Sequence, residues 1–238
     1  MNKLILPLIA LLFSSGSASS QYCYKAQHYY PGANYPPEVL QPDKDKMLYI
    51  TPDGPRRCLA YLDTNGIWKK YSTPRLDNSF ISEMVTLGDT VYFAASPAIG
   101  SLDIELYKYD GVNPPSLACD VLPGPNSADI KNLCLYDNKV YFQASLPLTG
   151  KELYAYDPST GTASIVKDLY PGVSDGYASH LKVFNGELFF SARSADNRFE
   201  MYSYNSNTNI VAKRTNISLG YSYWDIQPSE QTIIGNTM

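Results

Sequence analysis

Short apolar stretches alternate with polar turns along most of the chain, and no segment shows a sustained helical period of 3.6 residues. Three stretches share one pattern: VTLGDTVYFAAS (85–96), LCLYDNKVYFQAS (133–145) and LKVFNGELFFSAR (181–193). Each places two runs rich in β-branched and aromatic residues around a Gly-Asp, Asp-Asn or Asn-Gly turn, which predicts a β-hairpin. We therefore expect an all-β fold of antiparallel strands.

A further strand follows each hairpin, in ELYKYDG (105–111), ELYAYDP (152–158) and EMYSYNS (200–206). The glutamates that open these segments, Glu105, Glu152 and Glu200, are 47 and 48 residues apart. The segment CDVLPG (119–124) also recurs 48 residues later as KDLYPG (167–172). A period near 48 with several short strands per unit is typical of β-propeller blades. The sequence thus predicts a β-propeller of about four blades, each with four antiparallel strands.

Degenerate copies flank these units, because MLYI (47–50) and NISLG (216–220) keep parts of the pattern in register. We expect one propeller-like domain over 45–238, with repeats at 45–83, 84–131, 132–179 and 180–238. In this interpretation the first repeat begins on its second strand, and the C-terminal segment supplies the missing first strand. That arrangement would close the ring and leave no open sheet edge. The open alternative is an array that pairs with another chain.

Side chains alternate between the two faces of a strand, so Glu152, Tyr154 and Tyr156 share one face of the third strand. A blade is covered on both faces, and a buried glutamate then needs hydrogen-bond donors, which tyrosine hydroxyls or backbone amides can supply. We therefore assign Glu105, Glu152 and Glu200 a structural role, with a ligand-binding carboxylate in each blade as the alternative. Asp110 and Asp157 end their strands, where an Asx-type turn is expected.

The segment ELYKYDG resembles the bacterial ELWxxDGT repeat, with Tyr107 in the place of the tryptophan and Val112 in that of the final threonine. IVKDLYPGVSDGYASHLKVFNGELFFSA (165–192) is similar to the linker and hairpin of these hyalin-like repeats. The resemblance covers roughly 47–220. It implies a propeller in an exported or surface protein, usually one without an assigned activity. The chain departs from the pattern after Asp157 and at Asn205.

The first 20 residues have the features of a secretory signal peptide: Lys3, a short apolar run and a Ser-rich end. A Tyr- and Pro-rich leader follows at 21–44, before the repeats. No later apolar stretch is long enough for a membrane helix, so we expect no membrane insertion. We expect the mature protein to be secreted or periplasmic.

Four cysteines in an exported chain suggest two disulfides, with three possible pairings. We expect Cys119–Cys134 to join a fourth strand to the next blade, and Cys23–Cys58 to tie the leader to the first blade. The chain has two histidines and no zinc-type spacing, so no metal or other cofactor is expected. The net charge of −4, without a basic cluster, argues against a nucleic-acid partner.

No nucleophile and base pattern is evident, and the sequence contains no G-x-S-x-G motif. We expect a non-catalytic binding or interaction module whose partner is a glycan or a protein surface. The alternative is a propeller-based hydrolase or lyase that acts on a polysaccharide through paired carboxylates. Aromatic residues that break the repeat are the candidate binding residues, because such rings stack on sugars or anchor protein partners. They are Trp68, Tyr177, Tyr221, Tyr223 and Trp224.

Overall fold

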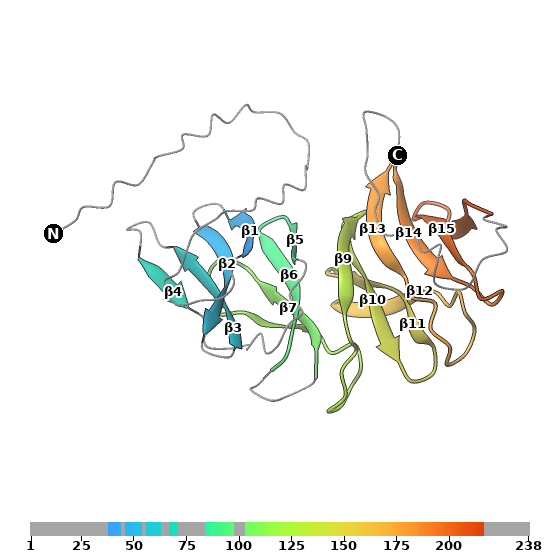
Figure 1. Ribbon diagram of the computed structural model, residues 1–238. Coiled ribbons are helices and arrows are strands. Elements are labelled where there is room, and N and C mark those ends of the chain that lie inside the picture. The colour runs from blue at the N-terminus through green and yellow to red at the C-terminus, as the bar shows by residue number, and fades with distance from the viewer. Residues whose placement is uncertain are drawn as a thin grey trace.

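The computed structural model describes residues 38–43, 46–53, 56–62, 67–70, 84–97 and 103–216. Within these ranges every element is a β-strand, and the strands form four antiparallel sheets of four strands each (Figure 1). The expectation of an all-β, antiparallel fold is therefore confirmed. The same ranges contain no helix with the length and apolar character needed to cross a membrane.

Each sheet is made of four strands that are consecutive in the chain. The first contains β1 (Glu38–Asp43), β2 (Lys46–Asp53), β3 (Arg56–Leu62) and β4 (Trp68–Lys70). The second contains β5 (Met84–Leu87), β6 (Thr90–Ala95), β7 (Glu105–Tyr109) and β8 (Ser116–Cys119). The third contains β9 (Lys131–Tyr136), β10 (Lys139–Leu146), β11 (Gly150–Asp157) and β12 (Thr162–Lys167). The fourth contains β13 (Ser179–Phe184), β14 (Glu187–Arg193), β15 (Phe199–Asn205) and β16 (Ile210–Lys213).

The first sheet begins earlier than expected, because β1 lies in the segment assigned to the leader. MLYI is part of the second strand, β2, as the pattern suggested, but β2 pairs with β1 along Glu38–Asp43. The sheet therefore has its own first strand and does not need one from the C-terminus. The C-terminal segment itself, 217–238, lies outside the described residues.

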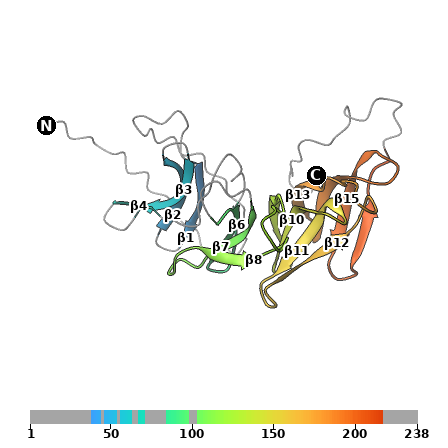
Figure 2. The ribbon, with the colours of Figure 1, turned by 90° about the horizontal axis from the view of Figure 1, so that it is seen from below.

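The sheets stack face to face in chain order. Their first strands contact one another in sequence, β1 with β5, β5 with β9 and β9 with β13. These four strands therefore form the inner side of the array, while β4, β8, β12 and β16 are the outer strands. Figures 1 and 2 both show the β1–β4 sheet and the β13–β16 sheet at opposite ends of this array.

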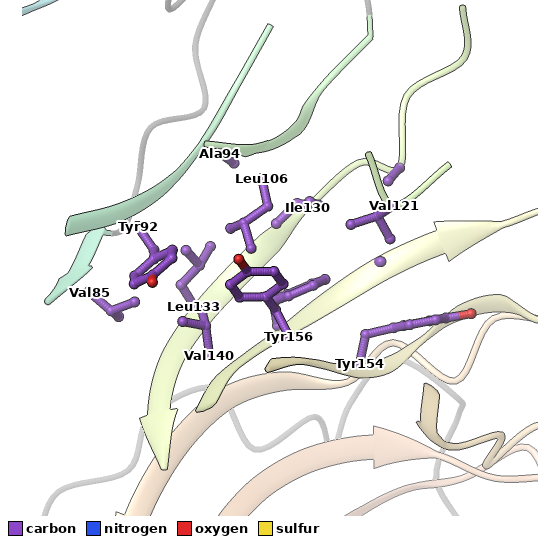
Figure 3. Packing of buried hydrophobic residues seen from close by; sticks show 13 residues of the cluster. Val85, Tyr92, Ala94, Leu106, Val121, Ile130, Leu133, Val140, Tyr154 and Tyr156 are labelled. Atoms are coloured by element: carbon purple, nitrogen blue, oxygen red, sulfur yellow. The ribbon is translucent and has the colours of Figure 1, made fainter. Parts of the chain in front are cut away.

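The best-defined core lies between the β5–β8 and β9–β12 sheets (Figure 3). Leu106 and Val85 from one sheet meet Phe142, Val140 and Tyr156 from the other. Leu106, Val140 and Phe142 are completely buried. Tyr156 belongs to the face that its strand shares with Glu152, so this face of β11 turns toward the preceding sheet.

A second core lies between the β9–β12 and β13–β16 sheets, around Tyr141, Leu153, Phe190 and Tyr202. Tyr136 also links these sheets through hydrogen bonds. Its hydroxyl donates to the Gly186 carbonyl at 2.7 Å and accepts from the Ser206 amide at 3.1 Å. A third cluster lies on the other face of β5–β8, where Tyr61 of β3 packs against it.

The aspartates that end the third strands form tight turns. The Asp110 carboxylate accepts from the amides of Val112 and Asn113, at 2.9 and 2.8 Å. The Asp157 carboxylate accepts from the Ser159 amide at 2.9 Å. This is the geometry of an Asx turn. Each turn connects the third strand of its sheet to the outer strand.

The structure does not form the expected Cys119–Cys134 disulfide, and both residues carry thiols. Cys119 packs against the core between the second and third sheets. Cys134 belongs to the core between the third and fourth sheets, and its thiol donates to the Leu135 carbonyl. The two side chains therefore lie on opposite faces of the β9–β12 sheet, which explains why the pairing was wrong. Cys23 of the other expected pair lies outside the described residues.

Candidate binding site

Two linkers carry the chain between sheets at one end of the array, which we name the linker end. The first linker, 120–130, joins β8 to β9, and the second, 168–178, joins β12 to β13. The turns 147–149 and 194–198 lie at the same end, because β10 and β14 run antiparallel to β9 and β13. The linker end therefore gathers irregular backbone on a rigid scaffold, where binding residues are commonly found.

Glu105 holds the first linker in place. Its Oε2 accepts from the amides of Val121 and Leu122, at 2.6 and 3.3 Å, and its Oε1 accepts from the Ala128 amide at 3.1 Å. The residue is 2% exposed. Burial raises the pKa of Glu105 to about 7, although these amides act in the opposite direction.

Glu152 does the same for the second linker. Its carboxylate accepts from the amides of Leu169 and Tyr170, both at 3.2 Å. The residue is completely buried, and this burial raises its pKa to about 8. Gly176, in the same linker, lies so close that a Cβ there would come within 2.6 Å of the Glu152 Cδ. The repeated glutamate therefore determines the path of the linker.

Glu200 is completely buried as well, but its partners are side chains. Its Oε2 accepts from the Thr215 hydroxyl at 2.5 Å, and its Oε1 lies 3.3 Å from the Lys213 ammonium. The Thr215 hydroxyl in turn accepts from the Met201 amide at 2.9 Å. All three glutamates thus bind groups of their own chain and face away from solvent.

The linkers contain residues with left-handed backbone at repeating positions. Asp129 and Tyr177, which are 48 residues apart, have φ of 48° and 54°. Asn132 and His180, also 48 apart, have φ of 58° and 55°. Asparagine and aspartate adopt this conformation at little cost, whereas a bulky residue there is an outlier. Tyr177 is therefore the most strained of the four, and strain of this kind clusters at binding and catalytic sites.

Tyr177 is half-buried among cationic and aromatic side chains. The Arg193 guanidinium lies 5.2 Å from its ring centroid and 4.8 Å from that of Tyr170. Arg193 also donates from Nε and from a terminal nitrogen to the Asp175 carbonyl, at 3.0 and 2.7 Å. A hydrogen bond from the Tyr177 hydroxyl to the Asp175 carboxylate raises the tyrosine pKa. The two rings and the guanidinium between them form a planar, partly exposed platform.

A charged cluster lies next to this platform. The Asp129 carboxylate accepts from Lys131 at 2.7 Å and from Lys151 at 3.0 Å. Burial opposes ionisation here, but the two ammonium groups hold the pKa of Asp129 below its ordinary value. The Lys151 ammonium also lies 5.8 Å from the centre of the Tyr177 ring. The first linker, β11 and the second linker are therefore joined through one polar network.

The first strands of the last two sheets each contain a β-bulge near the linker end. The register of β9 against β10 shifts at Asn132, and that of β13 against β14 shifts at His180. The His180 Nδ1 lies 3.1 Å from the Ser179 hydroxyl. Bulges re-aim side chains, and they are frequent next to functional sites. Both bulges lie on inner strands that contact each other, so they extend the candidate site toward the axis of the array.

We define the candidate site by the residues of the platform, the network and the bulges. They are Asp129, Lys131, Asn132, Lys151, Tyr170, Asp175, Tyr177, His180 and Arg193. Of the aromatic residues expected from the sequence, Tyr177 belongs to this site. Trp68 is in β4, but its side chain is not among those described, and Tyr221, Tyr223 and Trp224 lie outside the described residues.

Sequence reasoning missed Arg193, Tyr170 and Lys151. Arg193 interrupts the repeat, because Ser145 occupies the equivalent position 48 residues earlier. That break in the pattern is the signal that could have identified it. In the part of the chain that the structure describes, no group of three or more His, Cys, Asp or Glu side chains could hold a metal ion.

No family model matches this chain, and no curated protein matches its sequence. Among solved structures, it is similar to TolB from Acinetobacter baumannii, with 15% identity, a TM-score of 0.50, and coverage of 77% of this chain and 43% of that one. It is equally similar to the β-propeller domain of the Trilobed protease from Pyrococcus furiosus, described as having an open velcro topology, with 15% identity, a TM-score of 0.50, and coverage of 76% and 55%. A puromycin hydrolase also matches, with 13% identity, a TM-score of 0.50, and coverage of 75% and 28%.

These matches establish the class of fold. The stacked four-stranded antiparallel sheets are those of a β-propeller protein. The chain spans about half, or less, of the length of the propeller structures it matches. At these identities the likeness concerns the fold alone.

Proposed function

We propose that this protein is an exported, non-catalytic binding module of the propeller type, and that its partner, a glycan or a protein surface, binds at the linker end. The observation that carries the proposal is the strained Tyr177, held with Arg193 and Tyr170 in a partly exposed platform. The four sheets are its blades, with a repeat of about 48 residues of the ELWxxDGT type. A signal peptide at 1–20 directs it to the periplasm or the exterior.

The chemistry of the site fits such a partner. Aromatic rings give a large contact area at low entropic cost, and a tyrosine hydroxyl adds a hydrogen bond. Asn132 and His180 add amide and imidazole groups on the neighbouring inner strands. Arginine and tyrosine are the residues most often responsible for binding energy at protein surfaces. A planar sugar ring and a flat side chain of a partner protein can both stack on this platform.

The alternative, carboxylate catalysis on a polysaccharide, has one observation in its favour. The pKa values of Glu105 and Glu152, about 7 and about 8, lie in the range of a general acid. However, both residues are almost completely buried, and their oxygens accept from linker amides. A general acid must reach the atom that it protonates, so these contacts favour the structural role.

The proposal is tested by binding of the mature chain to a glycan array and by pull-down of protein partners, each compared with the Tyr177→Gly variant. Glycine relieves the left-handed strain and removes the ring, so binding should fall by about tenfold or more without loss of stability. Asn185→Gly is the matched control, because Asn185 is also left-handed, with φ of 47°, but lies in the β13–β14 turn at the opposite end. Binding that survives Tyr177→Gly would exclude this site.

A further inference from the structure

The β13–β16 sheet has a second face, turned away from β9–β12, which we call the distal face. Leu188, Phe190, Tyr202 and Tyr204 point toward β9–β12, so the residues that alternate with them point the other way. In the preceding sheet, the equivalent positions are Cys134, Tyr136, Tyr141 and Leu153. Those four residues are 2%, 8%, 2% and 0% exposed, because the next sheet covers them. Their counterparts 48 residues later, on the distal face, are Lys182, Phe184, Phe189 and Met201.

The distal face has the composition of a contact surface. Phe184 and Phe189 pack edge to face, with ring centroids 6.0 Å apart. The Arg214 guanidinium lies 5.9 Å from the Phe189 centroid, and its Nε donates to the Ser203 hydroxyl at 2.6 Å. Ile210, on the outer strand of the same face, is 57% exposed. Aromatic residues, methionine and arginine are enriched in the cores of protein interfaces.

The fold indicates what such a face packs against. Each sheet uses this face to cover the next sheet of the array, so a further sheet is the surface that fits it by continuity. The β1–β4 sheet is at the other end of the array in both views (Figures 1 and 2). The four sheets also match only 55% of the length of a single propeller domain. The array therefore corresponds to part of a ring, and its first and last sheets are its two ends.

We propose that a second copy of this chain completes the ring. The distal face of β13–β16 in one copy packs on the β1–β4 sheet of the other, and a two-fold axis repeats the contact, so that both pairs of ends are covered. The sequence of β3 from Cys58 to Leu62 is apolar at every position, the pattern of a strand that is covered on both faces. Closure in this way removes two apolar sheet faces from water.

The decisive experiment distinguishes a second copy from closure within one chain. Unlabelled and 15N-labelled mature chains are mixed in urea, refolded together and cross-linked through lysines. Lys69 is on β4 and Lys182 is on the distal face of β13, so the proposal expects cross-links between them in which the two peptides carry different isotopes. Light scattering should give the mass of a dimer. Cross-links within one isotope only, or a monomer mass at about 100 μM, would overturn the proposal.

Substitutions then locate the interface. Phe189→Glu should weaken the dimer by on the order of 30-fold, because it places a charge in the centre of the contact. Val112→Glu is the control, since Val112 is 83% exposed in the β7–β8 turn, away from the distal face. If Phe189→Glu does not fold by circular dichroism, Ile210→Glu, which changes an exposed residue of the same face, replaces it. A dimer that persists in the folded variant refutes this interface.

Discussion

The carboxylate of Glu152 occupies the space that a side chain at Gly176 would need. A Cβ at residue 176 would lie 2.6 Å from the Glu152 Cδ and closer still to both oxygens. Gly176→Ala should therefore displace the carboxylate from the amides of Leu169 and Tyr170. We expect a loss of about 2–4 kcal/mol in the free energy of unfolding, measured by urea denaturation.

A double-mutant cycle tests whether the cause is this contact. In a Glu152→Ala background the added methyl group has room, so Gly176→Ala should then cost about 1 kcal/mol or less. Costs that simply add would show that the glycine is needed for another reason.

The same carboxylates should matter for stability through their acceptor geometry. In Glu105→Gln or Glu152→Gln, the new amide nitrogen faces backbone N–H groups that need an acceptor. Each change should lower the free energy of unfolding by about 1–3 kcal/mol. Ligand binding should fall only as the fold loosens. An activity that one of these changes abolishes, at an unchanged melting temperature, would instead make that glutamate catalytic.

The repeat made the strands predictable, because strands rest on alternation and on short hairpins that a single sequence displays. The pattern of Leu153 against Tyr154 and Tyr156 gave the two faces of a sheet correctly. β1 was missed because EVLQPD has no counterpart motif and contains a proline. The partners of Glu105 are 16 to 23 residues further along an irregular linker, where no periodicity operates. The platform at Arg193 depends on such linker geometry, which explains why the sequence did not reveal it.

The two described cysteines provide a test of the sheet faces. Cys134 is 2% exposed, and burial raises the pKa of the Cys119 thiol, so both should react slowly in the native protein. Iodoacetamide should label both residues readily only after unfolding, without a reductant. Peptide mapping that finds Cys119 linked to Cys134 would contradict the assignment of these residues to opposite faces of β9–β12.

The buried glutamates also predict how stability changes with pH. Burial raises the pKa of Glu105 from 4.5 to about 7 and that of Glu152 to about 8, whereas both are ordinary in the unfolded chain. Above pH 4.5 the unfolded state therefore releases protons that the folded state keeps. The contribution of these groups is fully present below pH 4.5 and is lost as pH rises through 7 and 8.

Two aspartates set the acid limit. Hydrogen bonds, from Asn113 and Ser159 first of all, lower the pKa values of Asp110 and Asp157 from 3.8 to about 2. Their contribution is present above pH 3.8 and is lost as pH falls through 2. The free energy of unfolding should therefore be greatest near pH 4 to 5 and fall by a few kcal/mol, on the order of 1.4 kcal/mol per unit of pKa difference, by pH 8.5. Urea denaturation at pH 5 and 8.5 measures this difference, and it should shrink in the Glu105→Gln, Glu152→Gln double variant. Equal slopes for the two proteins would mean that other groups control the pH dependence.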